Sequence, residues 1–370
     1  MKKLLHFFKK ETVLCIAALL ALSSMFFVPP SAAYIEYIDL RVLSLLFCLM
    51  LVVEGMQTIG TFSFLGEKLL CHARNTRFIA FVLITLCFLS SMFITNDVAL
   101  ITFVPFAVMI LSMTGQNKLL IPVIVLQTIA ANLGSMLTPI GNPQNLYLYS
   151  FFNIPFWHFI LHMLPLTLAS AFMLVLAVLF IKNEPLTLPE NQNKTRISSM
   201  PRLGVYSLLF LVCLFCVLHI LPYPLMLAVV FLVILVCDKK LLVKADYFLL
   251  LTFICFFIFI GNMQHIPVVS DLLSWLISGR ELLLGILLSQ FISNVPSAIL
   301  LSGFTTNSAA LLCGVNIGGL GTLIASLASV ISYRYYAATN QADTGKYMLT
   351  FTIYNIIFLA VLSILAALII

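Results

Sequence analysis

The chain has 370 residues, of which 62% are hydrophobic and 9% charged, and its mean hydropathy is +1.14. Soluble domains carry about a quarter charged residues, so this composition excludes a soluble enzyme or binding domain and indicates a helical membrane protein. The net charge of +6 comes from basic residues in short polar segments, so we expect the lipid bilayer and no nucleic acid as a partner.

Apolar runs predict nine membrane crossings and two re-entrant hairpins in an all-α membrane protein. The crossings are expected near 12–28, 40–60, 118–150, 157–182, 204–220, 222–237, 246–264, 307–334 and 347–370, and the hairpins near 78–113 and 281–304. The expected organisation is an N-terminal helix and loop at 1–39, a first repeat at 40–182, a cytoplasmic linker at 183–203 and a second repeat at 204–370.

Basic residues in the loops predict the orientation, because cytoplasmic loops carry an excess of lysine and arginine. The N-terminal segment is basic, which predicts a multi-pass protein of the cell membrane with a cytoplasmic N-terminus. Nine crossings then place most other loop cations on the same side, and the outer loops carry Glu36, Asp39 and Asp271, with Arg280 as the basic exception. The cytoplasmic set comprises Lys2, Lys3, Lys9, Lys10, Lys68, Arg74, Arg77, Lys182, Lys194, Arg196, Arg202, Lys239, Lys240, Lys244, Arg334 and Lys346.

The beginning of the chain allows a second interpretation. Lys2 and Lys3, an apolar stretch and Ser31-Ala32-Ala33 are also typical of a cleavable signal peptide. A retained first helix is the simpler interpretation for a chain with many crossings.

Three blocks of the first half are repeated in the same order in the second half. Five crossings separate the starts of the two copies, and an odd number inverts the second copy, so the first hairpin should open inward and the second outward. Duplicated apolar segments with polar interruptions are the best sequence indication of a transporter binding site. The paired blocks are 55–59 with 262–266, 93–97 with 291–295, and 132–138 with 316–322.

Small polar residues interrupt both hairpins at mid-membrane. Thr95, Asn96, Ser293 and Asn294 lie at the two turns and offer side-chain hydrogen bonds. Unpaired backbone groups at such turns are tolerated only where they line a buried cavity or water. These four residues are therefore candidates for substrate binding.

Two crossings are also broken. The segment 138–145 contains two prolines and Gly141, so it cannot be a continuous helix, and its counterpart contains several glycines. Helix N-termini at such breaks attract anions, whereas free carbonyls at the opposing ends can hold Na⁺. The breaks add Gly141, Asn142 and Asn316 as substrate candidates, and the coupling-ion candidates are Asn96, Asp97, Asn132, Asn294 and Gly318.

Two acids lie inside apolar sequence. Asp97 is at the first hairpin turn, where a carboxylate costs ~2.5–3.5 kcal/mol at the bilayer centre, so we expect it to bind the coupling cation or carry a proton. The alternative is a cap on the helix that leaves the turn. Glu54 lies near the end of its crossing, and a transport role is open for it as well. No lysine or arginine lies within a crossing near the breaks, so an anion would be held by backbone N–H groups, amides and hydroxyls, with or without a bound cation.

Other side chains with reactive chemistry are expected to be structural. The nine cysteines lie mostly in apolar runs, which predicts buried free thiols. His158 and His162 are one helical turn apart beside Trp157, which indicates an interfacial position more than a metal site. No phosphate-binding loop for ATP is present, and we expect no cofactor beyond Na⁺ or H⁺ as the coupling ion.

The segments 91–99 and 131–143 resemble the ion transporter superfamily, which includes citrate-transporter-like permeases, divalent anion:sodium symporters, and arsenite and Na⁺/H⁺ antiporters. The resemblance extends from about residue 40 onward. It implies an inverted-repeat transporter of the elevator type, usually a homodimer, whose hairpin tips and broken helices form the site. It adds Thr138 and Thr322 to the candidate site residues. The tips of the symporter branch read Ser-Asn-Thr, whereas Asp97 and Val295 stand at the threonine positions here.

The predicted function is secondary active transport of a small anion of the citrate or dicarboxylate class, coupled to Na⁺ or H⁺. Alternatives with the same fold are an arsenite or antimonite exporter and a Na⁺/H⁺ antiporter. A channel fits less well, because hairpins that open to opposite faces favour alternating access. An intramembrane hydrolase with Asp97 and Glu54 as paired acids is disfavoured, because the second repeat has no matching acid, so we expect no enzyme activity.

Overall fold

The computed structural model describes residues 11–32, 34–70, 75–185, 197–339 and 342–370, and these residues form helices and no strand. Eight of the described helices are long and apolar enough to cross a membrane, and a bent helix pair would make a ninth. The eight include both arms of the first hairpin, so this set is not the same as the nine crossings expected from sequence. Several basic residues used to predict the orientation lie outside the described residues, namely Lys2, Lys3, Lys9, Lys10, Arg74, Lys194 and Arg196.

Two sets of helices repeat one order: a long helix, a short helix, a two-helix hairpin, a broken span and a final long helix. The first set is α4 (Leu40–Thr58), α5 (Thr61–Leu70), α6 (Thr76–Ile94), α7 (Asn96–Met113), α8 (Leu120–Ser135), α9 (Pro143–Phe151) and α10 (Phe156–Leu179). The second set is α13 (Tyr247–Gln264), α14 (Pro267–Ile277), α15 (Glu281–Ile292), α16 (Asn294–Ser302), α17 (Ser308–Ile317), α18 (Leu327–Ala337) and α19 (Thr344–Ile369). The remaining elements are α2 (Thr12–Ser24), α3 (Tyr34–Tyr37), α11 (Met200–Val217), α12 (Tyr223–Asp238) and the 3-10 turns η1 (Asn117–Leu119), η2 (Lys239–Lys244) and η3 (Leu323–Ala325).

The predicted hairpins and breaks are confirmed. Thr95 alone separates α6 from α7, and Ser293 alone separates α15 from α16. The first broken span stops at Ser135 and restarts at Pro143, and the second stops at Ile317 and restarts at Leu327. Proline and glycine therefore interrupt the helices where the sequence indicated.

Two short helices, α5 and α14, were not expected. Each follows the first long helix of its set and precedes the hairpin, and α14 makes an angle of 106° with α15. Apolar residues gather on one face of each helix, with Phe62 buried in α5 and Ile277 buried in α14. A search for runs long enough to cross a membrane overlooks helices of this length and pattern.

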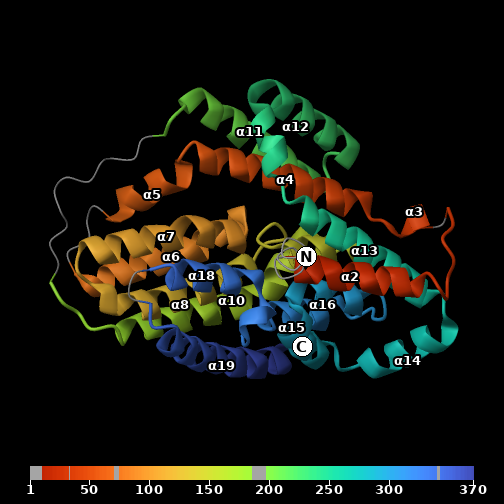
Figure 1. Cartoon of the computed structure of the whole chain (residues 1–370). Helices are drawn as coiled ribbons and strands as arrows, with labels where there is room; N and C mark the ends of the chain where they lie inside the picture. The colour runs from red at the N-terminus through yellow and green to blue at the C-terminus, as the bar shows by residue number, and fades with distance from the viewer. Residues whose placement is uncertain (1–10, 33, 71–74, 186–196, 340–341) are drawn as a thin grey trace, which may run out of the picture.

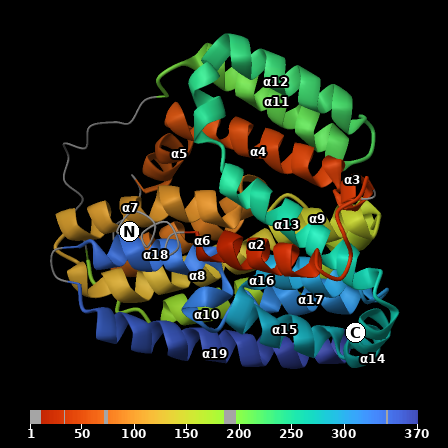
Figure 2. The same ribbon diagram turned by 45° about the vertical axis from the view of Figure 1, so that its right-hand side comes forward.

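The helices form two layers (Figures 1 and 2). The first contains α4, α5, α11 and α12, the second contains the hairpins, the broken spans and α19, and α2 and α13 lie between them. In Figure 1, α6 and α7 enter the bundle from the left whereas α15 and α16 enter from the right, so the two tips point toward each other near its middle. This arrangement is the inversion that the odd number of intervening crossings predicted.

A glycine in each broken span allows close packing on the first arm of its hairpin. A Cβ on Gly134 would lie 2.1 Å from the carbonyl oxygen of Phe88 and 2.7 Å from Ser91 Oγ. A Cβ on Gly318 would lie 2.7 Å from Ser289 Oγ. The two contacts are equivalent, because 318 − 134 = 184 and 289 − 91 = 198 are the offsets that align the repeated blocks. Each hairpin is thus positioned by its own broken span.

Candidate functional site

The two hairpin tips share an unusual backbone conformation. Thr95 has φ 69° and ψ 150°, and Ser293 has φ 74° and ψ 156°. Residues other than glycine rarely adopt this region, which costs ~1–3 kcal/mol and is concentrated at functional sites. The strain lets one residue reverse the chain at each tip and leaves the following helix N-terminus at the centre of the bundle.

A threonine in each broken span forms a hydrogen bond with the hairpin of the same repeat. The Thr138 hydroxyl donates to the carbonyl oxygen of Met92, and the Thr322 hydroxyl donates to that of Gln290 at 3.0 Å. These pairs obey the same offsets, since 290 − 92 = 198 and 322 − 138 = 184. Both candidate threonines therefore use their hydroxyl protons to hold a break against a hairpin arm, and Thr322 lies on an exposed part of the chain.

Asparagines join the two repeats at the centre. Ser326 Oγ donates to Asn132 Oδ1 at 2.9 Å, and Asn142 Nδ2 donates to Asn316 Oδ1 at 3.2 Å. The two bonds are equivalent, because 326 − 142 and 316 − 132 both equal 184. A side chain next to each break therefore donates a hydrogen bond to an asparagine of the other repeat, and all four side chains are buried.

The tip asparagines belong to the same cluster. Asn96 Nδ2 donates to Asn132 Oδ1 at 3.0 Å, and Asn132 Nδ2 donates to the carbonyl oxygen of Gly319 at 3.4 Å. Asn294, from the second tip, packs closely against Gly319. A Cβ added to Gly319 would lie only 2.8 Å from Asn294 Nδ2. The structure thus brings together five candidates predicted from sequence, Asn96, Asn132, Asn142, Asn294 and Asn316.

The two candidate glycines have packing roles at the breaks. The Gly141 carbonyl accepts a bond from the backbone N–H of Asn96 at 3.1 Å. A Cβ on Gly141 would lie 2.0 Å from the carbonyl oxygen of Ser135. Gly318 lies against Ser289, as described above, and its carbonyl accepts a bond from Gln290 Nε2 at 2.9 Å. The chain at both breaks therefore needs residues without a side chain.

Three residues that the sequence analysis did not select complete this network. Asn145 Nδ2 donates to the carbonyls of Ser135, Met136 and Thr138, at 3.2 Å each, and so satisfies the end of α8. Gln290 has the same function in the second repeat, because Nε2 also donates to the Leu320 carbonyl at 2.9 Å and Oε1 accepts from the Thr322 N–H. The third is Ser326, which the offset of 184 from Asn142 could have identified.

Asp97 faces a cavity of about 190 Å³ between the first tip and α4. Its Oδ1 atom is buried and has no hydrogen-bond partner, and among the described residues no backbone N–H donates to its carboxylate. The alternative that Asp97 caps α7 is therefore wrong. Glu54 lines the same cavity and accepts a bond from Lys244 Nζ at 2.7 Å, in a pair whose side chains are 30% and 47% exposed. Thr95, Asn142 and Asp246 complete its polar lining.

A second cavity, of about 310 Å³, lies at the other tip. Its polar lining residues are Ser293 and Arg334, and most of the others are apolar side chains from α2, α13, α15, α16 and α18. Arg334 lies at the end of the second broken span, as the sequence predicted, in the last turn of α18. Its side chain is exposed and also lines this cavity, which the sequence did not indicate.

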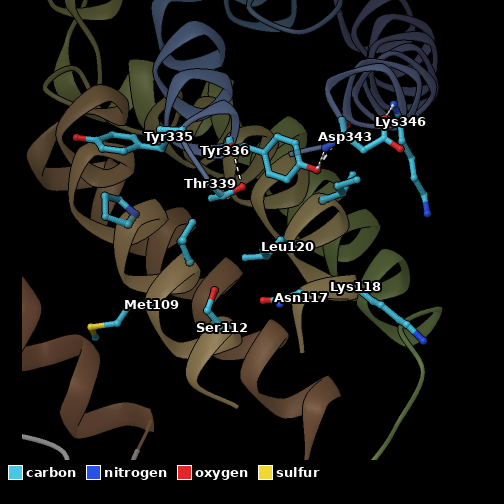
Figure 3. A pocket seen from close by; sticks show the side chains of 14 residues that line it. Met109, Ser112, Asn117, Lys118, Leu120, Tyr335, Tyr336, Thr339, Asp343 and Lys346 are labelled. Carbon is cyan, nitrogen blue, oxygen red and sulfur yellow. Dashed lines mark hydrogen bonds between the residues drawn. The ribbon is translucent and has the colours of Figure 1, made fainter. Parts of the chain in front are cut away.

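A larger groove of about 800 Å³ lies away from both tips, where the ends of α7, α8, α18 and α19 meet. Figure 3 shows Lys118 and Lys346 on one side of it and Met109 on the other, with the Tyr336 hydroxyl bonded to the Asp343 N–H at 2.9 Å. None of the candidate site residues lines this groove. The geometry therefore places the candidate site at the tips, where the polar residues converge inside an apolar bundle.

Two inverted hairpins whose polar tips lie at the centre of an apolar helical bundle are typical of a membrane transporter. A family model described as citrate transporter matches residues 8–312, and the chain belongs to this family. It is 36% identical over 323 residues to an uncharacterised transporter of Methanocaldococcus jannaschii, covering 86% of each chain. It is 34% identical over 325 residues to the inner membrane protein YbiR of Escherichia coli, covering 85% of each chain.

A third relative is similar over a shorter segment. The silicon efflux transporter LSI3 of Oryza sativa is 34% identical over 134 residues, which are 36% of this chain and 27% of that protein. Together with the family match, these relatives confirm the resemblance to the ion transporter superfamily and the assignment as a transporter.

Proposed function

We propose that this protein is a secondary active transporter of a small carboxylate anion, coupled to H⁺ through Asp97. The observation that carries the coupling is the buried Oδ1 atom of Asp97, which has no hydrogen-bond partner and faces a cavity at the first tip. Burying a carboxylate in an apolar bundle costs free energy, so acids at such positions typically mark proton or ion pathways. The carboxylate substrate class is supported by the citrate transporter family.

The hydrogen-bond network favours H⁺ over Na⁺ as the coupling ion. The amide oxygens of Asn96, Asn132, Asn142, Asn145 and Asn316 all accept hydrogen bonds within the cluster. A Na⁺ site built from these oxygens would have to use the lone pairs that the hydrogen bonds leave free, whereas a proton needs only one free oxygen, which Asp97 provides. Protonation would also remove the charge before the tip moves through the membrane.

A second candidate function is efflux of a small uncharged oxyacid. The first-tip cavity is lined by three carboxylates, Asp97, Glu54 and Asp246, but only one lysine, Lys244. This excess of negative charge repels a free anion and tolerates a neutral solute. The similarity to a silicon efflux transporter, over 36% of the chain, favours silicic acid and related arsenous or antimonous acids for this candidate.

The proposed assembly is a homodimer in the cell membrane with a cytoplasmic N-terminus. An apolar hollow on the outer face of α4 and α12, lined by Phe47, Leu227 and Phe231 among others, offers a surface for a second copy. The layer of α4, α11 and α12 would remain fixed while the hairpins and broken spans move, as in an elevator. Mass measurement in mild detergent tests the dimer, and a monomer would leave the moving layer without this support.

The function is tested with purified protein in liposomes. Uptake of radiolabelled citrate, succinate and phenylacetate is measured under an imposed pH gradient and, separately, an imposed Na⁺ gradient. We expect at least one carboxylate to accumulate under the pH gradient and none under the Na⁺ gradient alone. Accumulation driven only by Na⁺ would replace H⁺ as the coupling ion. Efflux of silicic or arsenous acid, without movement of any carboxylate, would establish the second candidate.

A further inference from the structure

We infer that Arg334 and the second-tip cavity bind the substrate anion, and that this site selects a carboxylate with one charged end and an apolar body. The inference rests on the proposed function and names the substrate class for it. The first tip, with Asp97 and two further carboxylates, then holds the coupling proton, and the second tip holds the anion.

Arg334 differs from every other arginine that the structure describes. Arg41 donates to the Cys216 carbonyl, Arg77 to the Ile181 carbonyl, Arg202 to Asp238 and Arg280 to the Leu276 carbonyl. Within the described ranges, the Arg334 guanidinium has no hydrogen bond and no carboxylate within 4.0 Å. The Arg334 side chain is exposed and also lines the second-tip cavity, so its donors are available to a ligand there.

A guanidinium is well suited to the charged end of such a ligand. Its planar fork forms two parallel hydrogen bonds with a carboxylate, and these charge-assisted bonds are stronger than neutral ones. The Ser293 hydroxyl lines the same cavity at the strained tip, and its bonds to Asn294 and the Ala325 carbonyl are long, at 3.5 and 3.4 Å. The cavity therefore offers a carboxylate one charged donor, Arg334, and one hydroxyl, Ser293.

The rest of the cavity is apolar and cannot satisfy additional charges. Phe256 comes from α13, Phe291 and Pro296 flank the tip, and Leu327 and Val330 lie on α18 before Arg334. A tricarboxylate or dicarboxylate would leave charged groups against these walls without partners, which is strongly unfavourable. An aromatic or branched aliphatic group would instead be buried favourably.

The volume sets the size of the ligand. At about 310 Å³ the cavity is at the small end of the usual range for small-molecule pockets, so it fits a small organic anion. Phenylacetate and 4-methylpentanoate are small molecules, and each has one carboxylate and an apolar body. They are the probes that match the site, whereas citrate and succinate match its charge at one end only.

Binding to the full chain in detergent tests the inference. We expect phenylacetate and 4-methylpentanoate to raise the melting temperature and to bind more tightly than citrate or succinate by calorimetry. Arg334→Gln should weaken phenylacetate binding about tenfold or more, as expected for lost hydrogen bonds to a charged group, and Arg334→Lys should recover part of the loss. Val330→Phe keeps the charge but fills the cavity, so it should reduce binding of both probes.

Arg280→Gln is the matched control, because Arg280 is exposed as Arg334 is but lines neither cavity, and this variant should bind the probes as the wild type does. The melting temperature of each variant without ligand shows whether it is folded. Unchanged phenylacetate binding by folded Arg334→Gln, or tighter binding of citrate than of phenylacetate by the wild type, would overturn the inference. Uptake of citrate under a pH gradient that is unaffected by Arg334→Gln would leave the proposed function intact and reject this site alone.

Discussion

The two hairpin tips have the same architecture but different chemistry. Both turn at one strained polar residue, both are fastened by a threonine from their broken span, and both send an asparagine toward the centre. They differ at the position two residues beyond the turn, where the first tip has Asp97 and the second has Val295. The cavities differ accordingly, since the first is lined by three carboxylates and the second mainly by apolar side chains with Arg334.

This comparison separates residues that build the fold from residues that act on ions or solutes. Residues that the duplication keeps in equivalent positions hold helices together, as Gly134 and Gly318 do. The cavities are lined partly by equivalent residues, such as Thr95 and Ser293, and the charged residues Asp97 and Arg334, which the duplication does not keep, make the two cavities different. Unequal effects of substitution at equivalent positions of the two repeats measure how far each repeat has specialised.

The largest effect on stability is expected where the broken spans pack against the hairpins. Gly134→Ala should be the more damaging glycine substitution, because its Cβ would lie 2.1 Å from a backbone oxygen of Phe88 that cannot move alone. We expect a loss of ~3 kcal/mol or more, at or beyond the upper end of overpacking costs. Gly318→Ala should cost about 1–3 kcal/mol, because its contacts are 2.7 Å or longer and include the Ser289 hydroxyl.

Thermal unfolding in detergent, followed by fluorescence, measures both glycine substitutions. Gly204→Ala is the control, since no atom lies within 4 Å of its added Cβ and it should leave the melting temperature unchanged. Equal and small losses at 134 and 318 would show that the helices are not packed as closely as described.

An intermediate effect is expected at the bonds that cross between the repeats. Asn142→Ala removes an amide that donates to Ser135 and Asn316 and a carbonyl that caps α9 at the Asn145 N–H, for an expected loss of ~3 kcal/mol. Ser326→Ala removes one bond to Asn132, which still accepts from Asn96, for an expected loss of ~1 kcal/mol.

Unfolding of the single and double variants checks this order. The double variants Asn142→Ala with Asn316→Ala and Ser326→Ala with Asn132→Ala should lose less stability than the sum of their single variants, because each pair shares a bond. Strict additivity in both pairs would argue against the two bonds that join the repeats.

The smallest effect on stability is expected at the mouth of the first-tip cavity. Glu54→Gln breaks the ion pair with Lys244, but both side chains are substantially exposed, so the loss should be within ~0.2–1 kcal/mol and should shrink further at high salt. Thermal unfolding at low and high ionic strength measures it. A loss of several kcal/mol in the free energy of unfolding would show that Glu54 stabilises the fold and does not merely line the cavity.

Much of the fold followed from sequence because the two repeats preserve polar interruptions in apolar runs. Thr95, Ser293 and the Thr138 to Asn145 segment mark turns and breaks that no continuous helix could accommodate. The amphipathic helices α5 and α14 did not follow, because their length and pattern are not those of a membrane crossing.

The candidate site was predicted less completely, because side-chain partners depend on packing between segments far apart in sequence. The asparagine cluster was expected, but Asn145 and Gln290 act on backbone carbonyls whose positions the sequence does not reveal. Arg334 was expected at the end of a crossing and lies in the last turn of α18, but the cavity that it lines depends on packing against α2 and α13. Asp97 was recognised from its cost in the membrane, but its free oxygen required the structure.

The central claim is that the first tip carries the coupling proton on Asp97. The most direct measurement follows internal pH with a trapped fluorescent dye when a transported carboxylate is added to liposomes that contain the wild type or Asp97→Asn. The account predicts a pH change with the wild type and none with Asp97→Asn, although the variant should insert, purify and exchange labelled for unlabelled substrate. Proton movement by Asp97→Asn equal to that of the wild type would contradict the claim.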